Sequence, residues 1–140
     1  MLDAYLDNLI EHSLECLQLL DEISLLASKG VLTKIEQSAA ERQLQVLTEA
    51  AIGIAKHWVK QQQGSVPADA YSSFEKLSQL GLLTAEELSQ WRKIIGLRNA
   101  LVHDYLSFSR DVLQRVLTQR HYQQVFDFIG QAAQALRSEP

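Results

Sequence analysis

The sequence contains one cysteine and two prolines, and its longest uninterrupted apolar run, 50–55, is only six residues long. Cys16 has no second cysteine to pair with, so an intrachain disulfide framework is excluded and a reducing compartment is expected. A membrane-spanning helix needs roughly 20 apolar residues, far more than this run supplies. The first residues, Met-Leu-Asp-Ala-Tyr, lack the basic segment of a secretory signal. We therefore expect a cytoplasmic protein that does not enter the membrane.

Positive charge is scarce in the first two thirds of the chain. The formal net charge is −4, but residues 1–91 carry a net of −7 and residues 92–140 a net of +3. The later segment could form a local anion-binding surface or simply solvated helix faces. This balance is too weak to predict a DNA-binding protein. The length of 140 residues and the 46% of apolar residues suit a single domain over 1–140.

Because prolines are almost absent, long helices are permitted, and the apolar residues recur at helical spacing. Segments matching the capping-box pattern begin at Thr33, Ser38 and Thr84. Glycines that could end helices in the left-handed conformation stand at 30, 64 and 81. The pattern predicts an all-α, antiparallel bundle of about five helices, over residues 2–28, 36–62, 69–80, 85–104 and 109–136.

Several common site motifs are missing. The sequence has neither the glycine-rich dinucleotide fingerprint nor the phosphate-binding loop motif, and no histidine follows a glutamate at the spacing of di-metal bundles. His12 and Cys16 lie four residues apart on one helical face, but two ligands are too few for a structural zinc. We expect no metal and no cofactor.

One segment, 96–105, concentrates chemically active side chains. Arg98, Asn99, His103, Asp104 and Tyr105 lie within eight residues of one another. Arg98 and Tyr105 share a helical face, whereas Arg98 and His103 lie about 140° apart on an ideal helix. Arg98 and His103 converge only if the helix ends near His103, or if two chains bring their segments together across an interface.

Two interpretations of this segment remain open. Arginine, histidine and tyrosine are more often structural than catalytic, as a solvated charge, a capping imidazole and a half-buried ring. The same groups could cleave RNA without metal. His103 would take the proton of a ribose 2′-hydroxyl, Arg98 would stabilise the charge on phosphorus, and Asn99 would position a phosphate oxygen or the imidazole.

The segment Arg98-Asn99-x-x-x-His103-x-Tyr105 resembles the R-x(4)-H-x-Y signature of HEPN domains, specifically of the HepT toxins in HepT–MntA (type VII) toxin–antitoxin systems. Residues 40–57 are similar to the second helix of that family, and residues 71–77 and 80–84 to the segment before its motif helix. The resemblance extends over roughly residues 5–135 and contains the complete motif.

The resemblance implies a HEPN-like fold, a homodimer and a metal-independent ribonuclease acting on tRNA or mRNA. Arg98 and His103 match the catalytic pair of the family, and we expect Asn99 and Asp104 to support them. Tyr105 matches the tyrosine that the partner antitoxin, an MntA-type minimal nucleotidyltransferase, modifies with AMP. An alternative is a non-catalytic HEPN subunit that serves a nucleotidyltransferase as scaffold or nucleotide-binding partner.

Other polar residues carry weaker signals. His57 and Lys93 could line the cleft, and Arg92 and Arg110 could steer RNA, with solvated or interface groups as the alternative. Trp91 and Tyr122 are expected to be packing residues. Glu49 is expected to pair with Arg42 or another cation and is not assigned a catalytic role.

Overall fold

The computed structural model describes residues 1–103 and 109–138. Its helices are α1 Leu2–Lys29, α2 Lys34–Gln63, α3 Ala70–Gln79, α4 Ala85–His103, α5 Arg110–Thr118 and α6 Tyr122–Ser138. The described residues contain no strand, which confirms the all-α prediction. The first four helices lie within two residues of their predicted bounds.

Local sequence chemistry sets several helix ends. Thr33 and Glu36 form a reciprocal capping box at the start of α2, and Thr84 and Glu87 form the same pair of hydrogen bonds before α4. Gly64 ends α2 at φ 83°, a left-handed conformation that glycine adopts at low cost. Two predictions were wrong. The segment beginning at Ser38 lies inside α2, because Thr33 already caps that helix, and Gly30 has an extended backbone at φ 161°.

The predicted single helix 109–136 is also wrong, because it divides into α5 and α6. The break includes Arg120, whose φ is 54°. Arg120 donates two hydrogen bonds to Asp21 of α1, from Nε at 3.0 Å and from Nη2 at 2.9 Å. The contacts with α1 therefore hold the corner in a conformation that a straight helix could not adopt.

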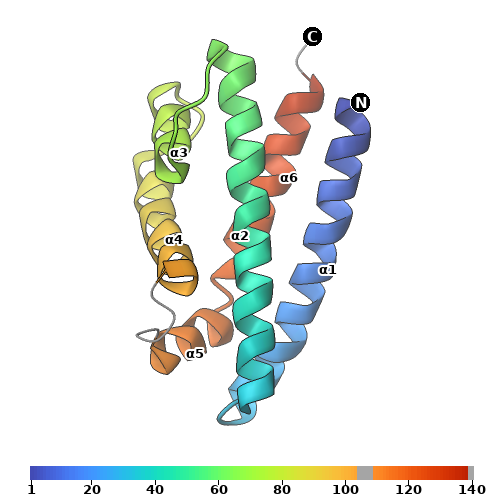
Figure 1. The fold of residues 1–140 in the computed structure, drawn as a ribbon, viewed down its shortest axis with the longest axis vertical. Helices are drawn as coiled ribbons and strands as arrows, with labels where there is room; N and C mark the ends of the chain where they lie inside the picture. Colours follow the sequence, from blue (N-terminus) through green and yellow to red (C-terminus); the bar gives the residue numbers. More distant parts are fainter. Residues whose placement is uncertain (104–108, 139–140) are drawn as a thin grey trace.

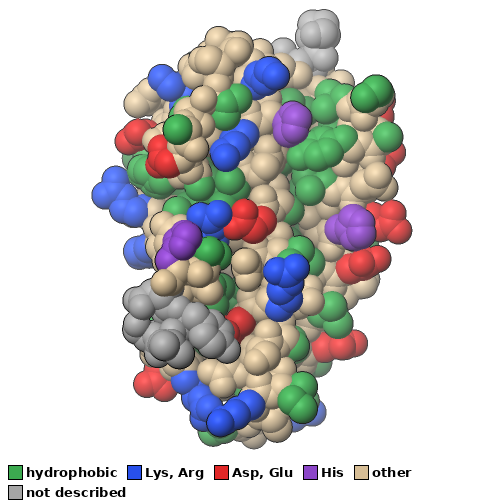
Figure 2. Space-filling view, in the orientation of Figure 1, with side chains coloured by type: hydrophobic (Ala, Val, Ile, Leu, Met, Phe, Trp, Pro, Cys, Tyr) green, Lys and Arg blue, Asp and Glu red, His purple; other side chains and the backbone are tan. Residues whose placement is uncertain are grey.

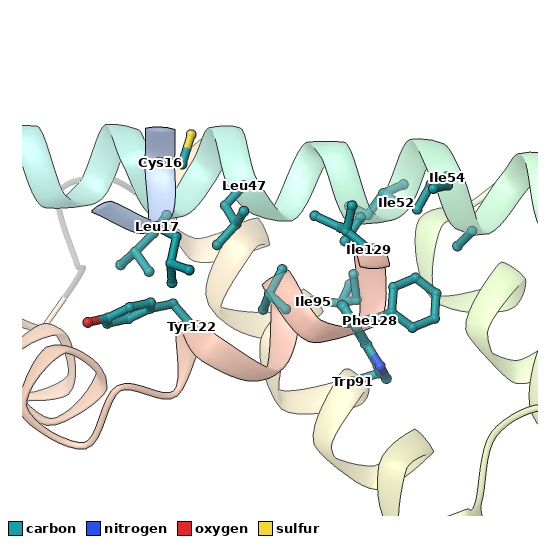
Figure 3. Packing of buried hydrophobic residues seen from close by; sticks show 14 of the residues in the cluster. Cys16, Leu17, Leu47, Ile52, Ile54, Trp91, Ile95, Tyr122, Phe128 and Ile129 are labelled. Carbon is teal, nitrogen blue, oxygen red and sulfur yellow. The ribbon is translucent and has the colours of Figure 1, made fainter. Parts of the chain in front are cut away.

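Helices α1, α2 and α6 lie side by side along the long axis of the molecule, with α3 and α4 on the other flank of α2 (Figure 1). Helix α5 packs against the lower part of α1. A cluster of aromatic rings joins the two layers. Trp91 of α4 stacks on Phe74 of α3 with ring centroids 4.0 Å apart, and it meets the edge of Phe128 of α6 at 4.9 Å. Figure 3 shows Trp91 and Phe128 together at this junction.

All the described helices contribute buried apolar residues to one core. Trp91 and Tyr122 are each 1% exposed, which confirms both as packing residues. Cys16 is buried as a free thiol. Among the described residues, no helix is long and apolar enough to cross a membrane.

Candidate active site

Helix α4 carries the polar segment singled out in the sequence, and its apolar face holds it in place. Trp91, Ile95 and Leu101 are buried, whereas Val102 is exposed. Leu101 therefore helps to anchor the end of α4, and Val102 does not. Because Trp91 is fixed between α3 and α6, the rotation of α4 about its own axis is set by packing.

This rotation directs Arg98 toward α2. Its Nε donates a hydrogen bond to Oε1 of Glu49 at 2.5 Å, and its Nη1 donates to Oδ1 of Asn99 at 3.0 Å. The side chain of Arg98 is 23% exposed and that of Glu49 is 42% exposed. The guanidinium is thus held by two acceptors on different helices while its edge still reaches solvent. Figure 2 shows basic and acidic side chains adjoining where α2 and α4 meet.

Glu49 is the functional neighbour that sequence reasoning did not identify. A cationic partner was expected for it, and the structure assigns Arg98, which lies 49 residues later. No spacing rule links these two positions, because their contact depends on how the α3–α4 pair packs against α2. The sequence offers one signal, an acid directly before the apolar run 50–55, but this signal does not select one cation over another.

His103 is the last residue of α4 and its side chain is exposed. Five residues separate it from Arg98, which places the two side chains about 140° apart and roughly 7.5 Å apart along an ideal helix axis. Within the described ranges, the hydrogen bonds of the Arg98 side chain go to Glu49 and Asn99 and none goes to His103. One chain therefore presents the two groups on different faces of the last part of α4. Asp104 and Tyr105 lie outside the described residues.

The two residues expected to line a cleft lie on different helices. His57 packs against Tyr5 of α1, with ring centroids 4.8 Å apart. Lys93 lies in a groove between α4 and α5. Of the two flanking arginines, Arg92 donates to the phenol of Tyr71 at 3.1 Å, and Arg110 donates to Gln37 at 3.3 Å.

A small hollow of about 170 Å³ lies between α2 and the end of α4, beginning one turn before Glu49. Polar residues of α2, including Gln45, Arg42 and Glu41, line it on one side, and Leu101 lines it from α4. Burial raises the pKa of the Glu41 carboxyl. The end of α4 therefore carries an anchored guanidinium and an exposed imidazole, with a small hollow beside it.

This arrangement suits reactions at a phosphate. A guanidinium presents several N–H donors in a fixed plane, which matches the oxygens of a phosphoryl group. An exposed imidazole can exchange a proton near neutral pH. In the parts of the chain that the structure describes, no group of three or more His, Cys, Asp and Glu side chains is placed to hold a metal ion.

Comparison with known proteins adds independent findings. The family model described as "Ribonuclease HepT-like" matches residues 13–132. The chain is 38% identical over 86 residues to the mRNA nuclease HepT of Shewanella oneidensis, an alignment spanning 61% of this chain and 64% of that protein. It is 36% identical over 70 residues to the tRNA nuclease HepT of Aphanizomenon flos-aquae, spanning 50% and 48%. The alignments thus cover about half to two thirds of these two relatives.

A third relative is aligned over more of its length. A putative RNase of Archaeoglobus fulgidus is 33% identical over 111 residues, spanning 79% of this chain and 77% of that protein.

Solved structures agree with the fold. A toxin–antitoxin complex with AMP-PNP contains a chain that superposes with a TM-score of 0.80 at 29% identity, covering 91% of this chain and 96% of that one. A tri-AMPylated HEPN toxin of Shewanella oneidensis, in complex with its MNT antitoxin, also gives 0.80, at 30% identity and 93% and 96% coverage. With the family model matching 120 residues and the helices superposing throughout, the chain belongs to the HepT-like family of HEPN proteins.

Proposed function

We propose that this chain is the toxin of a toxin–antitoxin pair and cleaves RNA without a metal ion. The observation that carries the proposal is the guanidinium of Arg98, which Glu49 and Asn99 hold about one and a half turns before the exposed His103. A helical scaffold has no need of an anchored, partly exposed arginine on the same helix as an exposed histidine. The relatives named as nucleases support the same reaction class.

In the proposed reaction, His103 takes the proton from a ribose 2′-hydroxyl. The 2′-oxygen attacks the adjacent phosphorus, the bond from phosphorus to the 5′-oxygen breaks, and the 5′-oxygen takes a proton from water. The products are a 2′,3′-cyclic phosphate and a 5′-hydroxyl end. Arg98 stabilises the extra negative charge that develops on the phosphoryl oxygens during the attack.

We further propose a homodimer in the cytoplasm, because Arg98 and His103 of one chain diverge by about 140° and a second copy would complete the site. The RNA substrate is a tRNA or an mRNA. The relative from Shewanella oneidensis is named as an mRNA nuclease and that from Aphanizomenon flos-aquae as a tRNA nuclease.

Control of the toxin is proposed to be covalent. The phenol oxygen of Tyr105 attacks the α-phosphorus of ATP on a nucleotidyltransferase antitoxin, the phenol proton passes to a base of the antitoxin, and pyrophosphate leaves. The attached AMP adds a negative charge two residues after His103, where it competes with RNA phosphate for Arg98. One structural neighbour, described as a tri-AMPylated toxin with its antitoxin, supports this form of control.

The decisive experiment is RNA cleavage in EDTA by protein made without its partner and shown by intact mass to be unmodified. Wild type, His103→Ala and His12→Ala are compared on pools of tRNA and mRNA. His12 is an exposed histidine on α1, so its replacement tests for nonspecific effects. We expect cleavage by wild type and His12→Ala and none by His103→Ala. Absence of cleavage by folded wild type on both pools would instead favour a non-catalytic scaffold.

A further inference from the structure

The carboxylate of Glu49 beside Arg98 is unfavourable for RNA binding. A carboxylate at 2.5 Å from the guanidinium places negative charge where an RNA phosphate must approach. Both side chains are partly exposed, and ion pairs of this kind contribute only about 0–1 kcal/mol to stability. Stability therefore gives little reason for this acid to be here.

The geometry of the guanidinium suggests what the contact achieves. Arginine has five N–H donors in one plane. Glu49 accepts from Nε and Asn99 accepts from Nη1, so the protein engages donors on two of the three guanidinium nitrogens. These two contacts fix the plane of the guanidinium, and with it the orientation of the donors that neither acceptor engages. A long side chain held in this manner loses little further rotamer freedom when it contacts a phosphate.

We propose that Glu49 is a positioning residue for the ribonuclease reaction: it fixes the guanidinium of Arg98 in the orientation that stabilises the transition state. This inference rests on the proposed function. It predicts two opposite effects of removing the carboxylate charge. RNA binds more tightly, because a repulsive charge is gone, while cleavage slows, because Arg98 is no longer held.

The test measures binding and cleavage separately. Affinity for a short RNA is measured in the His103→Ala background, with and without Glu49→Gln, and single-turnover cleavage is measured with and without Glu49→Gln in otherwise wild-type protein. We expect Glu49→Gln to bind RNA more tightly and to cleave about 10- to 100-fold more slowly. Glu49→Ala should cleave more slowly still, since the amide oxygen of glutamine can accept a hydrogen bond from Nε and alanine cannot. Glu11→Gln, at an exposed acid on α1, is the charge-matched control.

The outcomes separate the two proposals. Wild-type cleavage rates in Glu49→Gln would overturn the positioning role alone. Equal losses of affinity and of rate would also overturn it, because they indicate general damage to the site. If wild type itself cleaves no RNA, the proposed function fails and the positioning role falls with it.

A second observation concerns the groove that contains Lys93. This groove has a volume of about 300 Å³ and lies between α4, α5 and the α5–α6 corner. Its floor is apolar, including Ile94, Leu97 and Val116, and its rim carries Lys93, Arg115 and His121. A second hollow of about 270 Å³ shares Lys93 and His121 and continues the groove toward Gln124. The described residues that line the two hollows include no acid.

Cations above an apolar floor match the two parts of a nucleotide, since the cations attract phosphate and the floor accepts a base. This acid-free, basic groove stands out in a chain whose residues 1–91 carry a net charge of −7. We infer that this groove binds a part of the RNA substrate away from the cleaved bond. The inference rests on the proposed function, but RNA binding tests it without cleavage.

The test is RNA affinity at several salt concentrations in the His103→Ala background. Lys93→Glu with Arg115→Glu should weaken binding by more than about 10-fold and should make the salt dependence shallower. Lys34→Glu with Lys60→Glu changes the net charge equally at exposed sites on α2 and serves as the control. Unchanged RNA affinity would overturn the inference, and loss of antitoxin binding instead would assign the groove to a protein partner. AMP binding as tight as RNA binding would overturn it in favour of a free nucleotide.

Discussion

The phenol of Tyr122 donates a 2.6 Å hydrogen bond to Oδ1 of Asp21, which lies 101 residues earlier in the chain. The same carboxylate oxygen accepts from Nε and Nη2 of Arg120. Asp21 thus joins α1 to the corner between α5 and α6. Nearby, the hydroxyl of Ser24 donates to the carbonyl of Leu117 at 2.7 Å, which adds a second link between the same elements.

Replacing Asp21 should therefore destabilise the protein. Asp21→Ala removes the acceptor of three hydrogen bonds and leaves the buried phenol of Tyr122 without its partner, so we expect a loss of about 2 kcal/mol in the free energy of unfolding. Urea denaturation checks this value. Glu22→Ala, at the exposed neighbouring position, should change the free energy by less than about 0.5 kcal/mol. A similar effect of both substitutions would contradict the structural role of Asp21.

The Tyr122 phenol should also make stability depend on alkaline pH. Burial, together with the hydrogen bond to Asp21, raises the pKa of Tyr122 above its ordinary value of 10.0. Because the folded pKa is raised, the contribution to stability is fully present below the unfolded pKa and is lost as the pH rises through the folded pKa. Urea unfolding at about pH 8 and about pH 11 should show a larger loss for wild type than for Tyr122→Phe. Equal losses would show that another group causes the pH dependence.

Arg98→Lys should greatly slow the proposed RNA cleavage although it preserves the charge. Lysine cannot contact Glu49 and Asn99 from a planar fork while it offers further donors to a phosphate. We expect the cleavage rate to fall by about 100- to 1,000-fold, the scale of losing one donor to a developing oxyanion. Single-turnover cleavage measures this loss. Arg137→Lys provides the comparison, since Arg137 bonds Asp7 on α1 at 2.6 Å, and wild-type cleavage is expected from it.

Tyr105→Phe should separate catalysis from control. If the tyrosine is only the acceptor of AMP, the variant retains RNA cleavage and gains no mass on incubation with ATP and the nucleotidyltransferase antitoxin. Wild type gains the mass of AMP and loses cleavage under the same conditions. Loss of cleavage by folded Tyr105→Phe would instead give the phenol a catalytic role.

The sequence predicts those features that depend on nearby residues. The capping boxes at Thr33 and Thr84 were found because each involves residues three positions apart. The helix break at Arg120 was missed because neither glycine nor proline marks it, and the carboxylate that holds it is on α1.

The same division applies to the candidate site. Arg98, Asn99 and His103 lie within one short segment, so their grouping could be predicted from the sequence. Their partner Glu49 could not, because only the packing of α4 against α2 brings it to Arg98.

The fold also determines when a newly synthesised chain acquires this site. The pair of Arg98 and Glu49 forms only after α4 has packed on α2, and Trp91 of α4 lies against Phe128 of α6. A nascent chain that ends before α6 lacks this contact, so its α4 is not yet fully packed. We therefore expect the pair of Arg98 and Glu49 to be fully assembled only after the segment Tyr122–Ser138 has left the ribosome, so the site is among the last parts of the fold to form.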